Sequence, residues 1–216
     1  EALQCPTLFM NGFGGHRIEG IGDKHVPWVH NVRNTDAVAA IDDEDCMRIF
    51  RLFNEKEGTA FLSGLGVNSS VLGNLPLLGI SSIGNLLAAI KTARYFELDE
   101  HDCVFTIFTD SAGMYRSRLD ELRTESGRYN RTAAAGDFAG PLAHQSIDFF
   151  RELTYYDRKA IHNLKYFTWV EQQGKTAGEL LAQWDPEYWR SRFEDEVEDF
   201  DKQIAEFNGL APRGGA

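Results

Sequence analysis

The chain has 216 residues, of which 43% are hydrophobic and 12% aromatic, which is enough for one large domain or two small ones. Its formal net charge of −11 argues against partners such as nucleic acids or anionic membranes, because both would repel an acidic protein. No apolar run approaches the roughly 18 residues of a membrane span, and we recognise no signal peptide. The three cysteines have no metal-site spacing and leave one unpaired, so we expect reduced thiols and a cytoplasmic protein.

The first third of the chain is predicted to pass from loop to strand to helix. Residues 1–36 are rich in glycine and are expected to form loops. The segment 36–41 (DAVAAI) is predicted to be a short buried strand. Asp42 or Asp43 can then cap the N-terminus of an amphipathic helix that ends near Gly58 and carries its apolar residues at helical spacing.

The middle of the chain is predicted to hold a loop, a helix, a strand and a helix. The segment 58–79 is rich in Gly, Ser and Asn, and we interpret it as a lid or a surface excursion. Ser81 or Ser82 is expected to cap a helix that runs to Leu98. The segment 103–109 (CVFTIFT) is apolar on both faces, as a strand covered on both sides must be. It ends on Asp110 and Ser111, which lead directly into a helix that extends to about Glu125.

This alternation predicts an α/β fold, with an open, mainly parallel sheet and helices on both of its faces. Only two or three strands are predicted, whereas such sheets usually have about five or six. We therefore expect a partial fold whose missing strands come from elsewhere in a longer polypeptide.

Beyond the α/β region the chain is predicted to be helical, which divides it into residues 1–125 and a helical extension, 126–216. The final helix is expected to begin at Pro186 and to end at Asn208-Gly209. Its apolar stripe favours packing on the body or on a second subunit, and a partner-binding helix is the alternative. The stripe comprises Trp189, Phe193, Val197, Phe200, Ile204 and Phe207. The tail 211–216 is predicted to be disordered.

Three stretches resemble the cysteine synthases and cystathionine β-synthases, which are fold-type II pyridoxal-phosphate (PLP) enzymes with a tryptophan-synthase-β-like fold. His16–Pro27 (HRIEGIGDKHVP) resembles their His-Lys/Arg-Ile-Gln/Glu-Gly-Ile-Gly segment. Gly79–Asn85 (GISSIGN) resembles their Gly-Ile-Ser-Ser-Gly helix start, and Phe108–Ser117 (FTDSAGMYRS) resembles their Asp/Ser-Ser-Gly-x-x-Tyr-x-Ser segment. The order is that of the family, and the resemblance covers roughly residues 11–125.

The resemblance implies that Ser111 donates its hydroxyl hydrogen to the pyridine nitrogen of PLP. A neutral donor leaves the ring largely unprotonated, which suits β-replacement or β-elimination on a small amino acid such as O-acetylserine, serine or threonine. Asp110 is the competing candidate, since successive side chains of extended chain point to opposite faces. In a further interpretation, the Asp-Ser pair only caps the next helix. The resemblance also places Gly20, Ile21 and Gly22 beside the cofactor and favours a homodimer.

Two departures from the family pattern limit the prediction. Lys24 and His25 stand where the family has Gly-Phe, which would suit an anionic or larger second substrate. The family's Schiff-base lysine lies upstream of the His-Arg-Ile-Glu-Gly segment, so this chain lacks it, and neither Lys24 nor Lys91 is expected to replace it. We therefore predict no catalytic residue in this chain, and no activity of the chain alone.

Two other functions are weighed. The first is a non-catalytic partner or regulatory subunit that keeps the fold, with the acidic helical tail as its binding surface. The second is an unrelated nucleotide-binding domain, which the lack of a Gly-rich strand-to-helix turn disfavours. The spacing of the histidines gives no metal site.

Overall fold

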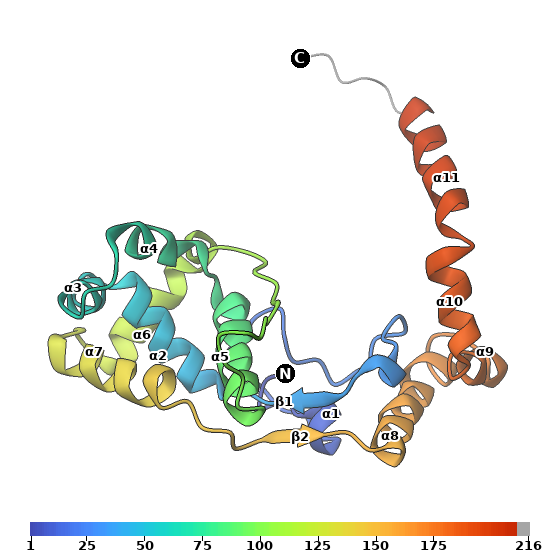
Figure 1. The fold of residues 1–216 in the computed structure, drawn as a ribbon, viewed down its shortest axis with the longest axis horizontal. Coiled ribbons are helices and arrows are strands. Elements are labelled where there is room, and N and C mark those ends of the chain that lie inside the picture. The colour runs from blue at the N-terminus through green and yellow to red at the C-terminus, as the bar shows by residue number, and fades with distance from the viewer. Residues whose placement is uncertain (211–216) are drawn as a thin grey trace. The chain divides into compact units, whose positions relative to one another are not determined.

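A computed structural model describes residues 1–210, so the prediction of disorder for 211–216 lies outside the described residues. The chain divides into two compact units, which are described separately (Figure 1). The first unit comprises residues 1–24 and 36–153, and the second comprises residues 25–35 and 154–216. No helix within residues 1–210 is long and apolar enough to cross a membrane.

The first unit is built around helix α2, Asp43–Asn54. Asp42 caps this helix by accepting a hydrogen bond from the backbone N–H of Glu44, and one apolar face of the helix is fully buried. The predicted amphipathic helix is confirmed, but it ends at Asn54, and Gly58, its expected end, lies in the next helix. Around it lie α1 (Thr7–Met10), α3 (Lys56–Gly64), α4 (Ser69–Asn74), α5 (Ile80–Tyr95), α6 (Arg116–Ser126), α7 (Arg131–Asp137) and the π-helix η4 (Phe138–Ala143).

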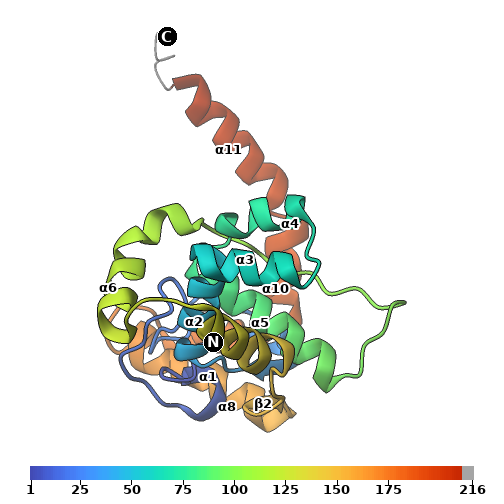
Figure 2. The same ribbon diagram turned by 90° about the vertical axis from the view of Figure 1, so that its left-hand side faces the viewer.

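Three local predictions are wrong. The segment 58–79 is mostly helical, because Asn68 caps α4 through the N–H of Ser70 and α3 packs on α2. Helix α5 begins at Ile80 with Gly79 at its N-cap, so Ser81 and Ser82 lie buried in its first turn instead of capping it. The segment 103–109 forms no strand with any described residue, and it loops away from the helices between α5 and α6 (Figure 2).

The described sheet has two antiparallel strands, β1 (Ala37–Ala39) and β2 (Phe150–Glu152). The predicted strand at 36–41 is thus confirmed as β1. Ala2 adds a single parallel bridge to Ile41, where the N–H of Leu3 donates to the carbonyl of Ile41 over 2.8 Å. The open, mainly parallel sheet stays a prediction, since its further strands were expected from elsewhere.

The boundary between the units lies beyond the expected one at residue 125. Helix α7 packs on α2 and α3, and Arg48 of α2 forms an ion pair with Asp137 over 2.7 Å. The hydroxyl of Tyr129 donates to the same carboxylate over 2.8 Å. These contacts hold residues 126–143 in the first unit.

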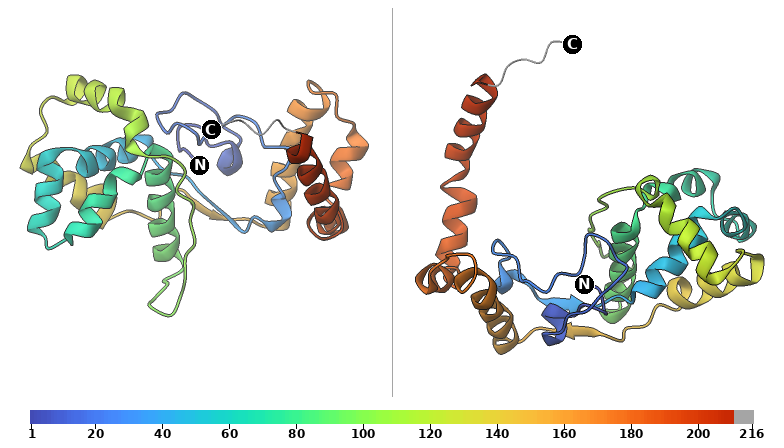
Figure 3. Two further views of the ribbon diagram at one scale, coloured as in Figure 1. Left: turned by 90° about the horizontal axis from the view of Figure 1, so that it is seen from above. Right: turned by 180° about the vertical axis from the view of Figure 1, so that it is seen from behind.

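The second unit is helical, and the segment 25–35 belongs to it. Its expected final helix is two helices, α10 (Pro186–Glu194) and α11 (Val197–Leu210), which follow each other end to end (Figure 3). Trp189 is buried, whereas α11 buries none of its residues. The other elements are the 3-10 helix η1 (Val32–Asn34), α8 (Tyr155–Lys165), the π-helix η5 (Tyr166–Val170) and α9 (Ala177–Ala182).

Candidate functional site

The structure brings the three family-like stretches together in the first unit. A Cβ added at Gly20 would lie 3.8 Å from the side chain of Ser81, in the first turn of α5. The Ser81 hydroxyl in turn lies 2.8 Å from the hydroxyl of Thr109, which directly precedes Asp110 and Ser111. The Ser82 hydroxyl accepts a hydrogen bond from the N–H of Thr109 over 3.1 Å. Segments some 90 residues apart in the chain therefore meet at one place.

The loop 16–22 contains two glycines in a conformation that favours glycine. Gly20 and Gly22 have φ values of +85° and +95°, a region that L-residues other than glycine rarely occupy. The Nε2 of His16 donates to the carbonyl of Gly22 over 2.6 Å. The Nδ1 of the same ring is buried and has no hydrogen-bond partner among residues 1–210. Glu19 pairs with Arg118 of α6, which ties the loop to a second helix.

Ser111 lies at the end of the extended segment, half-buried, with φ −115° and ψ 160°. It precedes the 3-10 helix η3 (Ala112–Tyr115), but its side chain makes no capping hydrogen bond to it. The interpretation that the Asp-Ser pair only caps the next helix is therefore wrong for Ser111. Its hydroxyl is not committed to the helix that follows.

Asp110 has a structural role. Its carboxylate accepts a hydrogen bond from the hydroxyl of Tyr115, and its backbone carbonyl accepts one from the N–H of Gly79 over 2.9 Å. The bond to Asp110 raises the pKa of Tyr115 to about 12, so this phenol stays protonated at neutral pH. A Cβ at Gly79 would lie only 2.1 Å from the Asp110 Oδ1, so this close approach requires a glycine there.

The remaining predicted residues are less closely associated with this place. Ile21 is half-buried and packs on the core, whereas Lys24 is exposed. His25 is half-buried and begins the second unit. Lys91 is only 2% exposed, and its ammonium donates to the carbonyl of Ala40 over 3.0 Å, so it is a structural residue of α5. Its burial lowers its pKa.

The residues present offer two features that suit one edge of PLP. The Ser111 hydroxyl, which makes no capping hydrogen bond, is a suitable donor to a ring nitrogen, and the glycine backbone at 20–22 permits close approach of a flat ligand. The cavity lined by Ile21 and Gly84 measures about 20 Å³, which is room for a water molecule and not for a ring.

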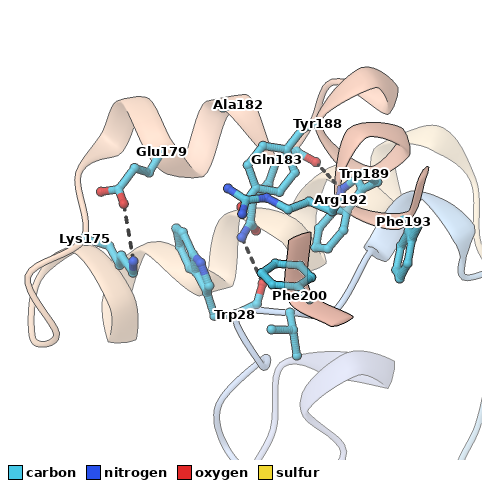
Figure 4. A pocket seen from close by; sticks show the side chains of 11 residues that line it. Trp28, Lys175, Glu179, Ala182, Gln183, Tyr188, Trp189, Arg192, Phe193 and Phe200 are labelled. Atoms are coloured by element: carbon cyan, nitrogen blue, oxygen red, sulfur yellow. Dashed lines mark hydrogen bonds and ion pairs between the residues drawn. The ribbon is translucent and has the colours of Figure 1, made fainter. Parts of the chain in front are cut away.

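A larger concavity lies in the second unit and was not predicted. This aromatic pocket has a volume of about 530 Å³ and lies between the loop 28–29, α9, α10 and the start of α11 (Figure 4). Its walls include Trp28, Lys175, Gln183, Tyr188, Trp189 and Arg192. The apolar spacing of the final helices marked Trp189, but no sequence signal brings Trp28 to it from 161 residues away.

Comparisons with protein-family models, with curated proteins and with solved structures found no match for this chain. Among residues 1–210, no group of three or more His, Cys, Asp or Glu side chains is placed to hold a metal ion.

Proposed function

We propose that this chain is the C-terminal portion of a PLP-dependent enzyme that catalyses β-replacement or β-elimination on a small amino acid. The observation that carries the proposal is the meeting of Gly20, Ser81 and Thr109 beside Ser111. A single cofactor site built from these three segments requires them to lie together, and they do. PLP, when bound, supplies an electron sink for the loss of a β-substituent.

In this proposal the residues of the chain bind and orient the cofactor. Ser111 donates its hydroxyl hydrogen to the ring nitrogen, and no formal charge is placed there. Asp110 holds the junction in position, because its carboxylate accepts the Tyr115 hydrogen bond and faces that phenol. Gly20 and Gly22 leave space for the substrate and cofactor, and Lys24 follows them on the substrate side.

The exposed segment 103–109 supports an incomplete α/β fold. Phe105 is 92% exposed and Ile107 is 73% exposed, although both residue types favour buried strands. Its backbone is partly engaged, since the carbonyl of Ile107 accepts from the side chain of Asn85 over 2.8 Å and the N–H of Thr109 donates to Ser82 over 3.1 Å. A neighbouring strand would pair with its remaining backbone groups. Such a strand would come from the remaining part of a longer enzyme, which would also supply the anchoring lysine and would form the predicted homodimer.

The test begins with the coding sequence immediately upstream of Glu1. An in-frame extension that encodes a lysine-bearing strand is expected, and the complete protein should then release or exchange the β-substituent of O-acetylserine or serine. Mixing the isolated chain with PLP and reducing with borohydride should give no stoichiometric adduct by mass spectrometry. A stoichiometric adduct that Lys24→Ala abolishes would contradict the proposal.

The second candidate function is a non-catalytic partner or regulatory subunit. The exposed apolar side chains of α11 favour it, since Phe200 is 45%, Ile204 57% and Phe207 71% exposed. A stop codon followed by a start codon directly upstream of Glu1 would favour this function over the first.

A further inference from the structure

The aromatic pocket of the second unit has the size of a small-molecule site. Its volume of about 530 Å³ lies within the roughly 300–1,000 Å³ of ligand pockets. Trp28 and Trp189 supply flat apolar walls, and Phe193 and Phe200 continue them onto the final two helices. All of these residues belong to the second unit, so the inference is independent of the PLP site.

Two buried polar residues hold these walls in place. The side chain of Gln183, which is 2% exposed, donates to the carbonyl of Trp28 over 3.0 Å, and its backbone carbonyl accepts the indole N–H of Trp189 over 2.8 Å. The ammonium of Lys165 donates to the carbonyl of Trp28 over 2.9 Å and to the side chain of Gln183 over 2.8 Å. Both tryptophans are thus positioned before any ligand arrives, which lowers the entropy lost on binding.

A buried positive charge, the ammonium of Lys165, lies near the pocket. Lys165 is fully buried, and its three hydrogen-bond acceptors are all neutral oxygens, the third being the carbonyl of His30. Its ammonium lies 5.9 Å from the ring of Trp28 and 5.8 Å from the ring of Trp189. Among residues 1–210 this buried cation has no counter-ion, and such a cation favours an anion nearby.

Two further cations lie on the pocket walls. The ammonium of Lys175 lies 5.3 Å from the Trp28 ring, and the guanidinium of Arg192 lies 5.1 Å from the Tyr188 ring (Figure 4). Lys175 pairs with Glu179 over 3.3 Å, and Arg192 pairs with Glu196 over 2.8 Å. These pairs are solvent-exposed and therefore weak, so a ligand carboxylate can replace one of them.

We propose that the aromatic pocket binds an aromatic carboxylate, with its ring against Trp28 and Trp189 and its carboxylate toward Arg192. The aromatic walls select a flat apolar body, and the three cations select the negative charge. A cationic ligand would be repelled by Lys165, and a neutral one would gain nothing from the positive charge, which exceeds the negative charge of Glu179 on the pocket wall and Glu196 beside it.

The test uses 3-phenylpropanoate and its neutral amide, 3-phenylpropanamide, as probes with the full chain. Tryptophan emission is a direct readout, because Trp28 and Trp189 line the pocket. Saturable changes in this emission are expected with 3-phenylpropanoate. The Kd should be on the order of 1 mM or tighter for so small a ligand. The amide should bind at least about fivefold more weakly than the carboxylate, since it lacks the negative charge.

Arg192→Gln should weaken binding of the carboxylate about fivefold and leave binding of the amide unchanged. Arg190→Gln is the matched control, because this arginine lies on the same helix, pairs with Glu187 and Glu194, and does not line the pocket. Far-UV circular dichroism of each variant confirms folding. Equal binding of carboxylate and amide would overturn the proposal and favour an apolar partner surface continuous with α11. The absence of saturable binding, or equal effects of the two arginine substitutions, would also overturn it.

Discussion

The phenol of Tyr115 donates its hydrogen to the carboxylate of Asp110, five residues earlier in the chain. This bond closes the junction between the extended segment and helix α6, and the backbone carbonyl of Asp110 joins the same junction to Gly79. The carboxylate next to Ser111 is therefore engaged with a phenol. Ser111 itself is left as the uncommitted donor of the pair.

Tyr115→Phe should destabilise the first unit by about 1–3 kcal/mol, because it leaves the partly buried Asp110 carboxylate with only the long 3.4 Å bond from the hydroxyl of Thr109. Urea unfolding followed by far-UV circular dichroism measures this loss. Tyr156→Phe serves as the control, since that side chain is 81% exposed. Equal stability of the two variants would show that the Asp110 bond contributes nothing.

Ser111→Ala should change the free energy of unfolding by no more than about 0.5 kcal/mol, because the hydroxyl caps no helix. Asn130→Ala provides the comparison, since Asn130 does cap α7 through the N–H of Ala133 over 3.0 Å and should lose about 1 kcal/mol. If the proposed function holds, the same Ser111→Ala change should lower kcat in the longer protein. A loss of stability at Ser111 equal to that at Asn130 would restore the capping interpretation.

Local sequence signals predicted those elements whose stability is local. Helix α2 was predictable because an Asp cap precedes an apolar face of helical period, and both act within one element. The segment 103–109 has the composition of a strand, but a strand needs a neighbour, and none is present among residues 1–210. The composition of this segment therefore predicted a buried strand, whereas the segment is exposed.

The two candidate sites also differ in how far local sequence signals predicted them. The glycine conformations at 20 and 22 were predictable, since only glycine adopts them readily. The aromatic pocket was not, because it depends on long-range hydrogen bonds from Lys165 and Gln183 to Trp28. Neither residue has a local pattern that predicts a partner 137 or 155 positions away.

Gly22→Ala should destabilise the first unit by about 1–3 kcal/mol, because φ is +95° and the new Cβ would lie 2.7 Å from the Nε2 of His16. Gly15→Ala is the matched control in the same loop, since a Cβ there meets nothing within 4 Å. Circular dichroism during urea unfolding compares the two. If Gly15→Ala were the more damaging change, the loop would have a different conformation in solution.

The second unit should lose stability as the pH falls from about 6.5 to about 4, because burial lowers the pKa of His162 from 6.5 to about 4. Between these values the unfolded chain binds a proton that the folded chain does not, so the contribution of His162 to stability rises with pH there and is constant below. This contribution is on the order of 1–3 kcal/mol, because solvent screening reduces the roughly 1.4 kcal/mol expected for each unit of pKa. Burial also lowers the pKa of His30, which acts in the same direction.

Tryptophan emission isolates this transition, because all four tryptophans lie in the second unit. The urea midpoint, and not the intensity, is the quantity to follow, since His162 lies 5.1 Å from the ring of Trp184 and its protonation would alter the emission directly. His162→Gln keeps a donor for the carbonyl of Leu180, which accepts from the imidazole over 3.0 Å, but it does not titrate. This variant should show a much flatter midpoint between pH 6.5 and 4, whereas His101→Gln, in the first unit, should match the unmodified chain. An unchanged slope in His162→Gln would assign the pH dependence to another group.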